Sequence, residues 1–572
     1  MSRRSTKRSK NIAAEVVKPV VEKGMLGGKY KPLSDHDIEQ IHQTTLDVLE
    51  NIGMGNPLPQ LKEAALKKGC IFTDQGRLLF PRSLVEDVIA RAGRDFIFYG
   101  RDSKHDMEMS DKKVHIYGGG EAVTVLDLGA KKYRPSTIND VYDIARLVDY
   151  LDNIHSYSRL VVATEFTDLL KTDINTSYAS VQGTSKHTAL TFADASHVEP
   201  TIEMLDIIAG GNGNFLKRPF CHGGGCTVVS PLRYGTDNCE VAIESIKFNA
   251  PVWVVIAPQS GATSPAALAG SLVQVLAETL ASLMLIDLIK PGHPVIFGPW
   301  PFVTDLRTGS FSGGSGEEAL MAAAAAQITN HYGLVSSVGA GMTDSKSPDA
   351  QAGYEKGITI AMAALAGCNN VSESSGMMAS LMGVSYESLV IDNDMIGMIL
   401  RAVRGIEVNE ETLSYQEIKN TVEGEGHFLR DPQTLSLMKT EYLYPELADR
   451  STQDVWDAIW GYIALEADKN TIKGAVFDHK AETAGLGAEI TQKWFLDRFV
   501  GEKIFNDNDE LVGISVSKTN NDPNGMDKDD NEVDAISGAT ITGDGVTNMI
   551  KERLQNYLSY FNNKNEIIAY QN

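Results

Sequence analysis

The sequence predicts an α/β protein: a (β/α)8 barrel of the TIM type followed by a small α+β domain. The first observation is a repeat, in the middle of the chain, of short apolar segments that each lead through a polar loop into a long helical stretch. The second is the length of 572 residues, which suits a barrel with a smaller partner. The third is a change in charge: residues 451–572 hold 11 basic and 21 acidic side chains, a net of −10 out of −23 for the whole chain.

Composition excludes some classes of function. The net charge of −23 argues against a nucleic-acid binder, since basic groups supply the affinity for phosphates. The most apolar stretch, residues 272–289, is interrupted by Glu278 and Asp287, so we expect no membrane span. The five cysteines are scattered and the basic start of the chain has no apolar segment behind it, which together predict a cytoplasmic protein with reduced thiols.

The first elements follow from capping signals. Residues 1–30 begin with MSRRSTKRSK and are expected to form a basic flexible arm. Ser34 precedes an apolar stripe at helical spacing, with an acidic residue three positions on, so a capped helix is predicted from there to Gly53. Thr137 starts a second helix of the same kind, which extends to Leu151.

The middle of the chain contains the clearest strand–helix units. Strands are predicted at 252–257, 294–298 and 334–340, and helices at 266–289, 317–330 and 352–365. No G-x-G-x-x-G turn follows an early strand, which favours a closed barrel over an open doubly wound sheet. The barrel is expected to occupy residues 31–450. In a barrel the loops that follow the strands line the site; here they are 258–265, 299–316 and 341–351.

Several segments in this part of the chain resemble one known family. They are SPLRYGTDNCEVAI (230–243), SGATSPAALAGSLV (260–273), GMTDSKSPDAQAGYEK (341–356), LVIDNDMIGMI (389–399) and GIEVNEETL (405–413). In this order they resemble the trimethylamine methyltransferase family, over about residues 30–450. The resemblance implies a barrel that moves a methyl group from a methylated amine to the cobalt of a partner corrinoid protein.

The sequence departs from the family at one position. Archaeal trimethylamine enzymes have pyrrolysine before the (Ser/Thr)-Asp-x-Lys stretch, whereas here Met342 precedes Thr343. Methionine has no electrophilic imine, so a step that needs that group cannot occur. Similar proteins without pyrrolysine act on quaternary amines such as glycine betaine, carnitine or proline betaine, and this class of substrate is predicted here.

A quaternary ammonium ion is best held by aromatic faces and a carboxylate. The candidate catalytic residues on or near the predicted loops are Asp344, Glu355 and His331, and the candidate substrate-binding residues are Trp300, Phe302, Met342 and Tyr354. Structural interpretations stay open for three of them: Tyr354 could pack at a helix start, Asp344 could cap a loop and His331 could belong to a turn. A structural role is also open for Lys186 and His187.

The segment Cys221-His222-Gly-Gly-Gly-Cys226 offers three possible zinc ligands. Its spacing is unfamiliar and no fourth ligand is nearby. Buried thiols beside a glycine-rich turn are therefore favoured, and no metal site is predicted.

Residues 451–572 resemble a second family. ETAGLGAEI (482–490), Trp494 and DAISGATITGDGV (534–546) are similar to the FMN-binding domain found in the sodium-translocating NADH:quinone reductase. In those proteins a separate flavin transferase esterifies FMN through its phosphate to the threonine of Ser-Gly-Ala-Thr. The resemblance implies Thr540 as the acceptor, and the other cofactor-binding candidates are Asp534, Ser537, Gly538, Ala539, Glu482, Thr483, Gly485, Leu486 and Gly487.

Three hypotheses for function follow. The first is a corrinoid-dependent methyltransferase for a quaternary amine, with a covalently flavinylated redox domain. The second is a flavin redox protein whose barrel binds a methylated amine without methyl transfer, and the third is a betaine-binding module. The expected partners are a corrinoid protein, the methylated amine and a flavin transferase, and the chain is expected to form a homo-oligomer.

Overall fold

The computed structural model describes residues 19–127, 129, 132–424, 426–448, 450, 459–480, 482–521, 526–528, 530–558 and 561. Most of the predicted basic arm (residues 1–18) lies outside the described residues. The chain divides into two compact units: unit 1 is Met1–Ile406 with Leu443–Leu447, and unit 2 is Glu407–Tyr442 with Ala448–Asn572. The chain therefore passes between the units three times, after residues 406, 442 and 447.

Unit 1 is built on parallel strands whose pairings return to their starting point. Within the described residues the strands are β7 (Lys113–Ile116), β10 (Tyr157–Ser158), β11 (Thr188–Leu190), β12 (Cys221–Gly225), β15 (Val252–Ile256), β17 (Val295–Pro299), β20 (Ser337–Gly339) and β21 (Asn370–Ser372). Each pairs in parallel with the next, through single bridges between β7 and β10 and between β17 and β20. The last strand, β21, pairs in parallel with β7, so the pairings form a closed ring.

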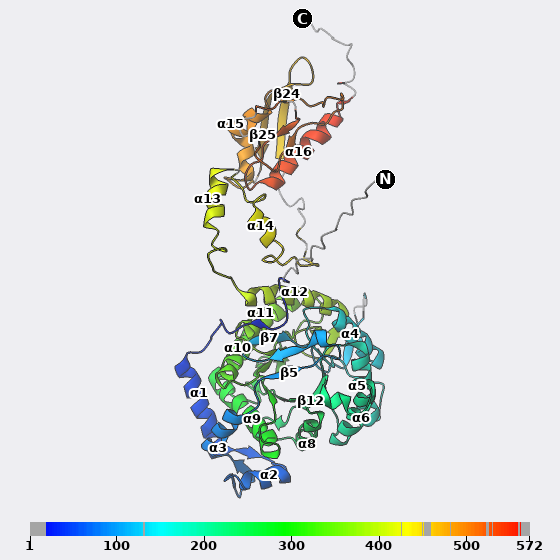
Figure 1. Cartoon of the computed structure of the whole chain (residues 1–572), viewed down its shortest axis with the longest axis vertical. Helices are drawn as coiled ribbons and strands as arrows, with labels where there is room; N and C mark the ends of the chain where they lie inside the picture. The colour runs from blue at the N-terminus through cyan, green and yellow to red at the C-terminus, as the bar shows by residue number, and fades with distance from the viewer. Residues whose placement is uncertain are drawn as a thin grey trace, which may run out of the picture. The chain divides into compact units, whose positions relative to one another are not determined.

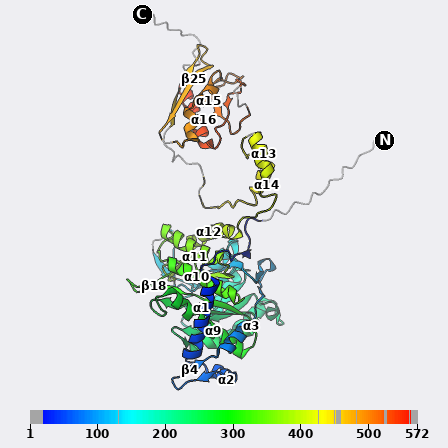
Figure 2. The same cartoon turned by 90° about the vertical axis from the view of Figure 1, so that its left-hand side faces the viewer.

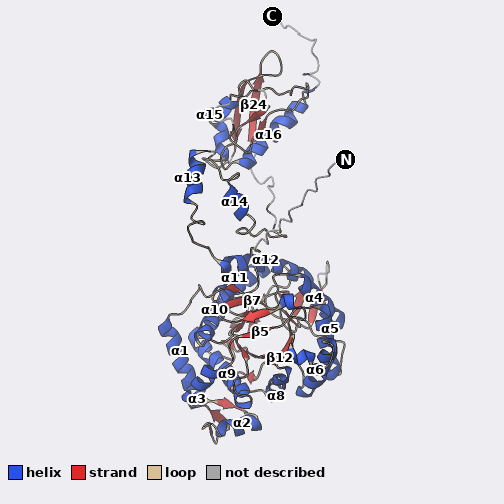
Figure 3. Cartoon of the chain, in the orientation of Figure 1, coloured by secondary structure: helices blue, strands red, loops and turns tan. Residues whose placement is uncertain are grey.

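A helix follows each of these strands before the next begins. In order they are α4 (Ile138–Tyr150), α5 (Leu169–Gly183), α6 (Val198–Ile208), α8 (Thr236–Ser245), α9 (Leu268–Ile289), α10 (Gly316–His331), α11 (Ala350–Leu365) and α12 (Tyr386–Arg404). Figures 1 and 3 show these helices around the strands. The predicted parallel strand–helix units are confirmed, and β15 and β17 are buried along their whole length.

The capping signals are also confirmed. Ser34 and Thr137 each form a capping box with the aspartate three residues on, at the starts of α1 (Asp35–Asp47) and α4. One turn of π-helix extends α1 to Ile52, and Gly53 ends it with a left-handed φ of 64°. Within residues 1–30, the segment β1 (Met25–Leu26) pairs with β7, so this part of the predicted arm is built into unit 1.

The helix α9 is apolar on nearly every face because it is covered from both sides. Its inner side packs on β15 and β17, and α1, α2 (Pro59–Leu66) and α3 (Arg82–Arg91) pack against its outer side (Figures 1 and 2). Of the described helices it alone has the length and composition of a membrane span, yet 83% of its most apolar stretch is buried inside the protein. It is therefore a buried core helix of unit 1.

Unit 2 contains its own α+β core. The hairpin β24 (Ile459–Leu465) and β25 (Ile472–His479) packs with α15 (Lys493–Leu496) and α16 (Thr540–Gln555) around Phe477, Phe495 and Phe499. The short strands β26 (Ser515–Val516) and β27 (Glu532–Val533) pair in parallel beside them. Two further helices, α13 (Tyr415–Glu423) and α14 (Pro432–Leu437), belong to residues 407–442 of this unit.

Candidate functional site

A cavity of about 520 Å³ lies where the parallel strands of unit 1 end. Its lining comes from residues at or just after the carboxyl ends of β10, β11, β12, β17 and β21, from β15 and from the start of α5. This is the end at which strand–helix units of this kind carry their functional groups. The chemically distinctive side chains in the lining are Glu121, Arg159, Asp173, Trp253, Trp300 and Glu373.

Two tryptophans form the aromatic part of this lining. Trp253 is on β15 and Trp300 follows β17, and their ring centroids lie 5.7 Å apart at an interplanar angle of 59°. The Trp300 Nε1–H donates a hydrogen bond of 3.3 Å to the Ser337 Oγ on the next strand, which fixes the orientation of the ring. Both indoles thus belong to the lining of the cavity, and aromatic rings are the surface that a methylated cation prefers.

An ion pair between a nearly buried arginine and an exposed glutamate belongs to the lining of the same cavity. The Arg159 Nη2 donates a hydrogen bond of 2.6 Å to Glu121 Oε1. The same guanidinium donates to the hydroxyls of Thr176 and Thr191, each at 2.8 Å. Glu121 therefore neutralises Arg159, which leaves the pair with no net charge to offer a ligand.

Glu373 is the second carboxylate in the lining. It is 5% exposed, and its Oε2 accepts a 2.8 Å hydrogen bond from the backbone N–H of Gly120. Burial raises the pKa of Glu373 to about 8, with the Gly120 hydrogen bond opposing the shift and the charge of Glu121 adding to it. Both Glu121 and Glu373 have left-handed backbone, with φ of 57° and 60°, a conformation that non-glycine residues adopt where the surrounding structure holds them in place.

The sequence-predicted residues of the loops lie at different distances from this cavity. Trp300 lines it. Phe302 and Met342 pack in the same buried aromatic cluster as Trp300, with Met342 fully buried, but they are not in the lining.

Asp344 and Glu355 brace the loop around Met342. Asp344 accepts hydrogen bonds from the Ser312 Oγ (3.1 Å), the Gly313 N–H (2.9 Å) and the Ser380 Oγ (2.7 Å), and so ties three loops together. Glu355 accepts from the Thr343 Oγ1 at 2.5 Å and from the Asp344 N–H at 2.9 Å. Their acceptor sites are thus engaged within the protein.

Tyr354 and His331 lie away from the cavity. Tyr354 is on α11 and is 65% exposed. His331 is the last residue of α10, the end of the helix that leads into the next strand, and it borders a separate small hollow with Lys31 and Asp35.

Lys186 and His187 have structural environments. The buried Lys186 Nζ donates to the carbonyls of Val148, Leu151 and Ile154 at 2.6–2.8 Å, and so caps the end of α4.

The His187 Nδ1 lies 2.8 Å from the carbonyl of Tyr99 and must carry the proton there, so its Nε2 accepts from the His222 Nδ1, also at 2.8 Å. His222 is therefore held by a histidine. Cys221 is buried beside it as predicted, whereas the predicted burial of Cys226 is wrong, because that residue is exposed.

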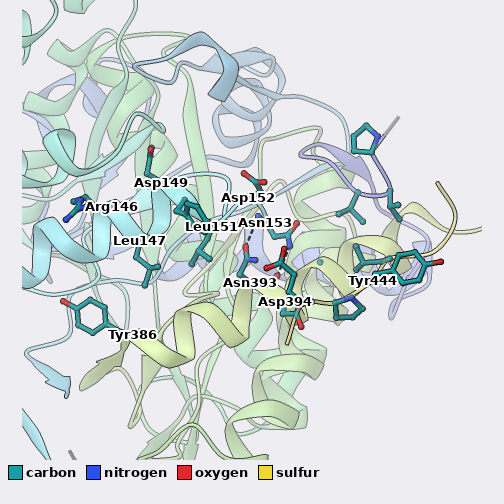
Figure 4. A pocket seen from close by; sticks show the side chains of 18 of the residues that line it. Arg146, Leu147, Asp149, Leu151, Asp152, Asn153, Tyr386, Asn393, Asp394 and Tyr444 are labelled. Carbon is teal, nitrogen blue, oxygen red and sulfur yellow. Dashed lines mark hydrogen bonds between the residues drawn. The ribbon is translucent and has the colours of Figure 1, made fainter. Parts of the chain in front are cut away.

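A larger hollow of about 1380 Å³ lies between α4 and α12, on the helical layer of unit 1. Figure 4 shows Asn153, Asn393 and Asp394 grouped within it. Asn153 donates two hydrogen bonds to Asn393, from its backbone N–H to Oδ1 and from its Nδ2 to the carbonyl. The Asp394 carboxylate accepts from the backbone N–H groups of Glu446 and Leu447 at 2.9 and 3.2 Å. The polar groups of this hollow thus hold the returning segment Leu443–Leu447.

In unit 2 the two glycine-containing motifs meet although they are about fifty residues apart in the chain. The Thr542 Oγ1 donates a 3.0 Å hydrogen bond to Glu482 Oε2. A Cβ at Gly487 would lie 1.8 Å from the same oxygen, and a Cβ at Gly538 would lie 2.8 Å from a methyl of Leu486. An alanine at position 487 would displace the hydrogen-bonded side chains of Glu482 and Thr542, so glycine there lets the turn of residues 482–487 close on the start of α16.

The predicted acceptor Thr540 is the first residue of α16 and is exposed, as are Ser537 and Gly538 before it. Ala539 and Asp534 are buried, and Asp534 Oδ1 accepts from the backbone N–H of Asn521 at 2.9 Å. In the other motif Gly485 has a left-handed φ of 78°, and the Thr483 carbonyl accepts from the N–H of Leu486 at 3.1 Å. A hydroxyl at the N-terminus of a sixteen-residue helix is a favourable place for a phosphate.

Comparison with known proteins adds two families. The family model of trimethylamine methyltransferase (MTTB) matches residues 1–478, and that of the FMN-binding domain matches residues 454–555. The trimethylamine methyltransferase MttB of Desulfitobacterium hafniense is 32% identical over 424 residues, 74% of this chain and 84% of the relative. The glycine betaine methyltransferase of the same species is 29% identical over 434 residues, 76% of this chain and 90% of the relative.

One example among the similar solved structures matches only a short segment of the chain. It is the NqrC-type component of the Na⁺-translocating NADH-quinone reductase from Parabacteroides distasonis, which is 41% identical to a segment that covers 19% of this chain and 53% of that chain, with a TM-score of 0.18. This chain therefore spans about half the length of that reductase component.

Proposed function

Because the chain belongs to the trimethylamine methyltransferase family, we propose that it transfers a methyl group from a quaternary amine to the cobalt of a partner corrinoid protein. The observation that carries this proposal is the cavity at the strand ends, where Trp253 and Trp300 face a lining that also holds Glu121 and Glu373. Aromatic faces and carboxylates are the groups that bind a permanently methylated cation. A glycine betaine methyltransferase among the relatives supports the choice of a quaternary substrate.

The chemistry asks little acid–base work of the protein. The partner's corrinoid supplies a nucleophilic cobalt, and the quaternary nitrogen leaves as a neutral tertiary amine, so no general acid is needed. This chain's residues would bind the cation, exclude water and hold one methyl group in line for transfer. Met342, at the position where the family resemblance implies pyrrolysine, supplies no electrophile and is buried against the aromatic cluster.

We further infer that the closed ring of parallel strands in unit 1 is a TIM-type barrel, and that it ends near residue 406 and not at residue 450, because residues 407–442 belong to unit 2. Asp344 and Glu355 then act as positioning residues that brace the loop carrying Met342. Trp300 is assigned to substrate binding, and Phe302 supports its ring from behind at a centroid distance of 5.9 Å.

The second part of the proposal is that unit 2 carries FMN, joined through its phosphate to Thr540 by a separate flavin transferase. The residues fit this group: Thr540 is exposed at a helix N-terminus, and the two glycine-containing motifs meet at the start of the same helix. FMN supplies the ability to accept an electron pair and release electrons singly. The match of residues 454–555 to the FMN-binding domain family supports this assignment.

The test is direct methylation of cobalt. The full-length protein is mixed with a reduced corrinoid protein and, separately, with glycine betaine, carnitine, proline betaine and trimethylamine, and the cobalt absorption is followed. We expect methylcobalt to form with a quaternary amine and only slowly with trimethylamine. Rapid methylation by trimethylamine alone would contradict the prediction that Met342 makes trimethylamine a poor methyl donor.

The alternative function predicts a different result. A flavin redox protein whose barrel only binds a methylated amine would give a yellow protein whose colour survives denaturation and no methylcobalt with any of the amines. Cobalt methylation therefore separates the two functions, and the covalent colour separates both from a simple betaine-binding module.

A further inference from the structure

Glu373 lines the strand-end cavity as a buried carboxyl group with a backbone hydrogen bond and no ion pair among the described residues. Its Oε2 is bonded to the Gly120 N–H, and a Cβ at position 120 would lie 2.9 Å from Oε1, so glycine at that position lets the carboxylate approach the backbone. Among the described residues, Glu373 makes no ion pair with a lysine, arginine or histidine. A carboxyl group buried beside a cavity without a cation lacks the partner that would stabilise its charge.

The other ionisable groups in the cavity lining do not supply a cationic partner for Glu373. Arg159 is held by Glu121 at 2.6 Å, and Asp173 is held by the His197 Nδ1 at 2.7 Å. Cys226 is exposed as a residue, but desolvation of its thiol beside the cavity raises the thiol pKa to about 11, with Glu121 and Glu373 adding to the shift, so the thiol is neutral near pH 7.

The energetics of Glu373 itself agree with this picture. Burial raises its pKa to about 8, so near pH 7 the free protein holds a proton on this carboxyl group. A cation placed in the cavity beside the carboxyl group favours the ionised form. Ligand binding and proton release are then thermodynamically linked.

We propose that Glu373 is the counter-ion of the cationic methyl donor and that binding of the cation expels the Glu373 proton to solvent. This proposal rests on the proposed function, since it uses the same cavity and substrate class. In the step the carboxyl O–H bond breaks, the proton goes to water or buffer, and no covalent bond forms with the cation. The site exchanges one positive charge for another, so its net charge is unchanged.

The sign of the pH dependence follows. Below about pH 8 the cation competes with a proton, so its dissociation constant should rise about tenfold for each unit by which the pH falls. Above about pH 8 the carboxylate is already ionised and the dissociation constant should level off. An uncharged ligand of similar size should show neither effect.

The experiment is calorimetric titration of the full-length protein with tetramethylammonium at pH 7, in two buffers of different ionisation enthalpy. We expect about 0.9 proton to be released per cation bound at pH 7 and about 0.1 at pH 9, as a carboxyl of pKa about 8 requires. tert-Butanol, as the uncharged probe, should release none. Binding without proton release at pH 7, or no binding of tetramethylammonium at pH 9, would overturn the proposal.

Two variants assign the proton. Glu373→Gln should abolish proton release and the pH dependence of binding and weaken binding at pH 9. Glu318→Gln is the matched control, because burial also raises the pKa of Glu318 well above its ordinary value, yet Glu318 does not line the cavity. It should keep the proton release of the wild type; if it loses the release while Glu373→Gln retains it, the assignment is wrong.

The experiments distinguish failure of the Glu373 proposal from failure of the proposed methyltransferase function. Cobalt methylation without linked proton release would overturn only this inference. Linked proton release without methylation of cobalt by any amine would support this inference and overturn the methyltransferase reaction.

Discussion

At the scale of single residues, some side chains of the cavity could be recognised from the sequence and others could not. Trp300 could be singled out because it follows a predicted strand directly, where a large aromatic residue indicates a binding surface. Trp253 could not, because it stands inside the apolar run VWVVI and looks like any residue of a buried strand. Glu121 follows β7, which is Lys-Val-His-Ile, and Glu373 follows β21, which is Asn-Val-Ser, so no continuous apolar run marked the loops that carry them.

The role of Trp300 can be tested by removing its ring. Trp300→Leu keeps an apolar side chain but loses the π-face, and a cation–π contact desolvated in a cavity contributes up to about 2 kcal/mol. We expect the dissociation constant of tetramethylammonium to rise roughly tenfold. Trp460→Leu, on β24 in unit 2, is the control; equal affinities in both variants would exclude Trp300 from the site.

At the scale of elements, the strands that the sequence predicted are those buried on both faces. β15 and β17 are continuous apolar runs, whereas β12 is Cys-His-Gly-Gly-Gly and β10 is only Tyr157–Ser158. The strands with polar or small residues contribute to the cavity or to the histidine pair. Their side chains therefore interrupt the apolar run by which a buried strand is recognised in a sequence.

The end of α4 provides a stability test. Lys186→Met leaves three buried carbonyls without their donor, and we expect unit 1 to lose about 2–4 kcal/mol in denaturant unfolding at pH 7. Lys171→Met, at an exposed lysine, should change stability by less than about 0.5 kcal/mol. No loss in Lys186→Met would mean that the carbonyls find other donors.

This cap also has a pH signature. Burial lowers the pKa of Lys186 from 10.5 to about 8, with Asp149 opposing the shift. Between these values the unfolded chain binds the proton and the folded chain does not, so wild-type stability should rise with pH in this window, relative to Lys186→Met. The gap between the two proteins should widen by up to about 1.4 kcal/mol per pH unit from pH 8 to 10.5 and stay constant below pH 7.

The turn that closes on α16 can be tested in the same way. Gly487→Ala places a Cβ 1.8 Å from Glu482 Oε2 and 2.5 Å from Thr542 Oγ1, so the hydrogen bond that joins the turn to α16 must shift or break. We expect this variant to lose most of its covalent flavin when it is produced with a flavin transferase. Gly474→Ala, on β25, is the control because its Cβ would meet nothing within 4 Å. Full flavin content in Gly487→Ala, read from the absorbance of denatured protein, would contradict the assignment.

At the scale of the whole molecule, the two families in one chain suggest a division of labour. Cobalt(I) is lost by oxidation to cobalt(II), which cannot attack a methyl group, so a corrinoid system needs an occasional one-electron reduction. We predict that Thr540→Ala retains methyl transfer from chemically reduced corrinoid but fails to restart a cobalt(II) pool from a physiological donor. Thr540→Ser, which keeps a hydroxyl at the helix start, should behave like wild type. Equal restart rates in Thr540→Ala and wild type would give the flavin another task.

The three passages of the chain between the units decide how the protein can be taken apart. A protease that cuts after residue 447 leaves residues 407–442 on the first fragment, although they pack within unit 2, where Arg430 donates a 3.2 Å hydrogen bond to Asn521. A cut after residue 406 leaves Leu443–Leu447 on the second fragment, although Asp394 holds that segment in unit 1.

Either nicked protein should therefore elute from a sizing column as one species in native buffer and separate into two only in denaturant. For the same reason, a flavin fragment that starts at residue 448 lacks part of its own unit. We expect it to melt at a lower temperature than one that starts at residue 407, and equal melting temperatures would show that residues 407–442 add nothing to that fold.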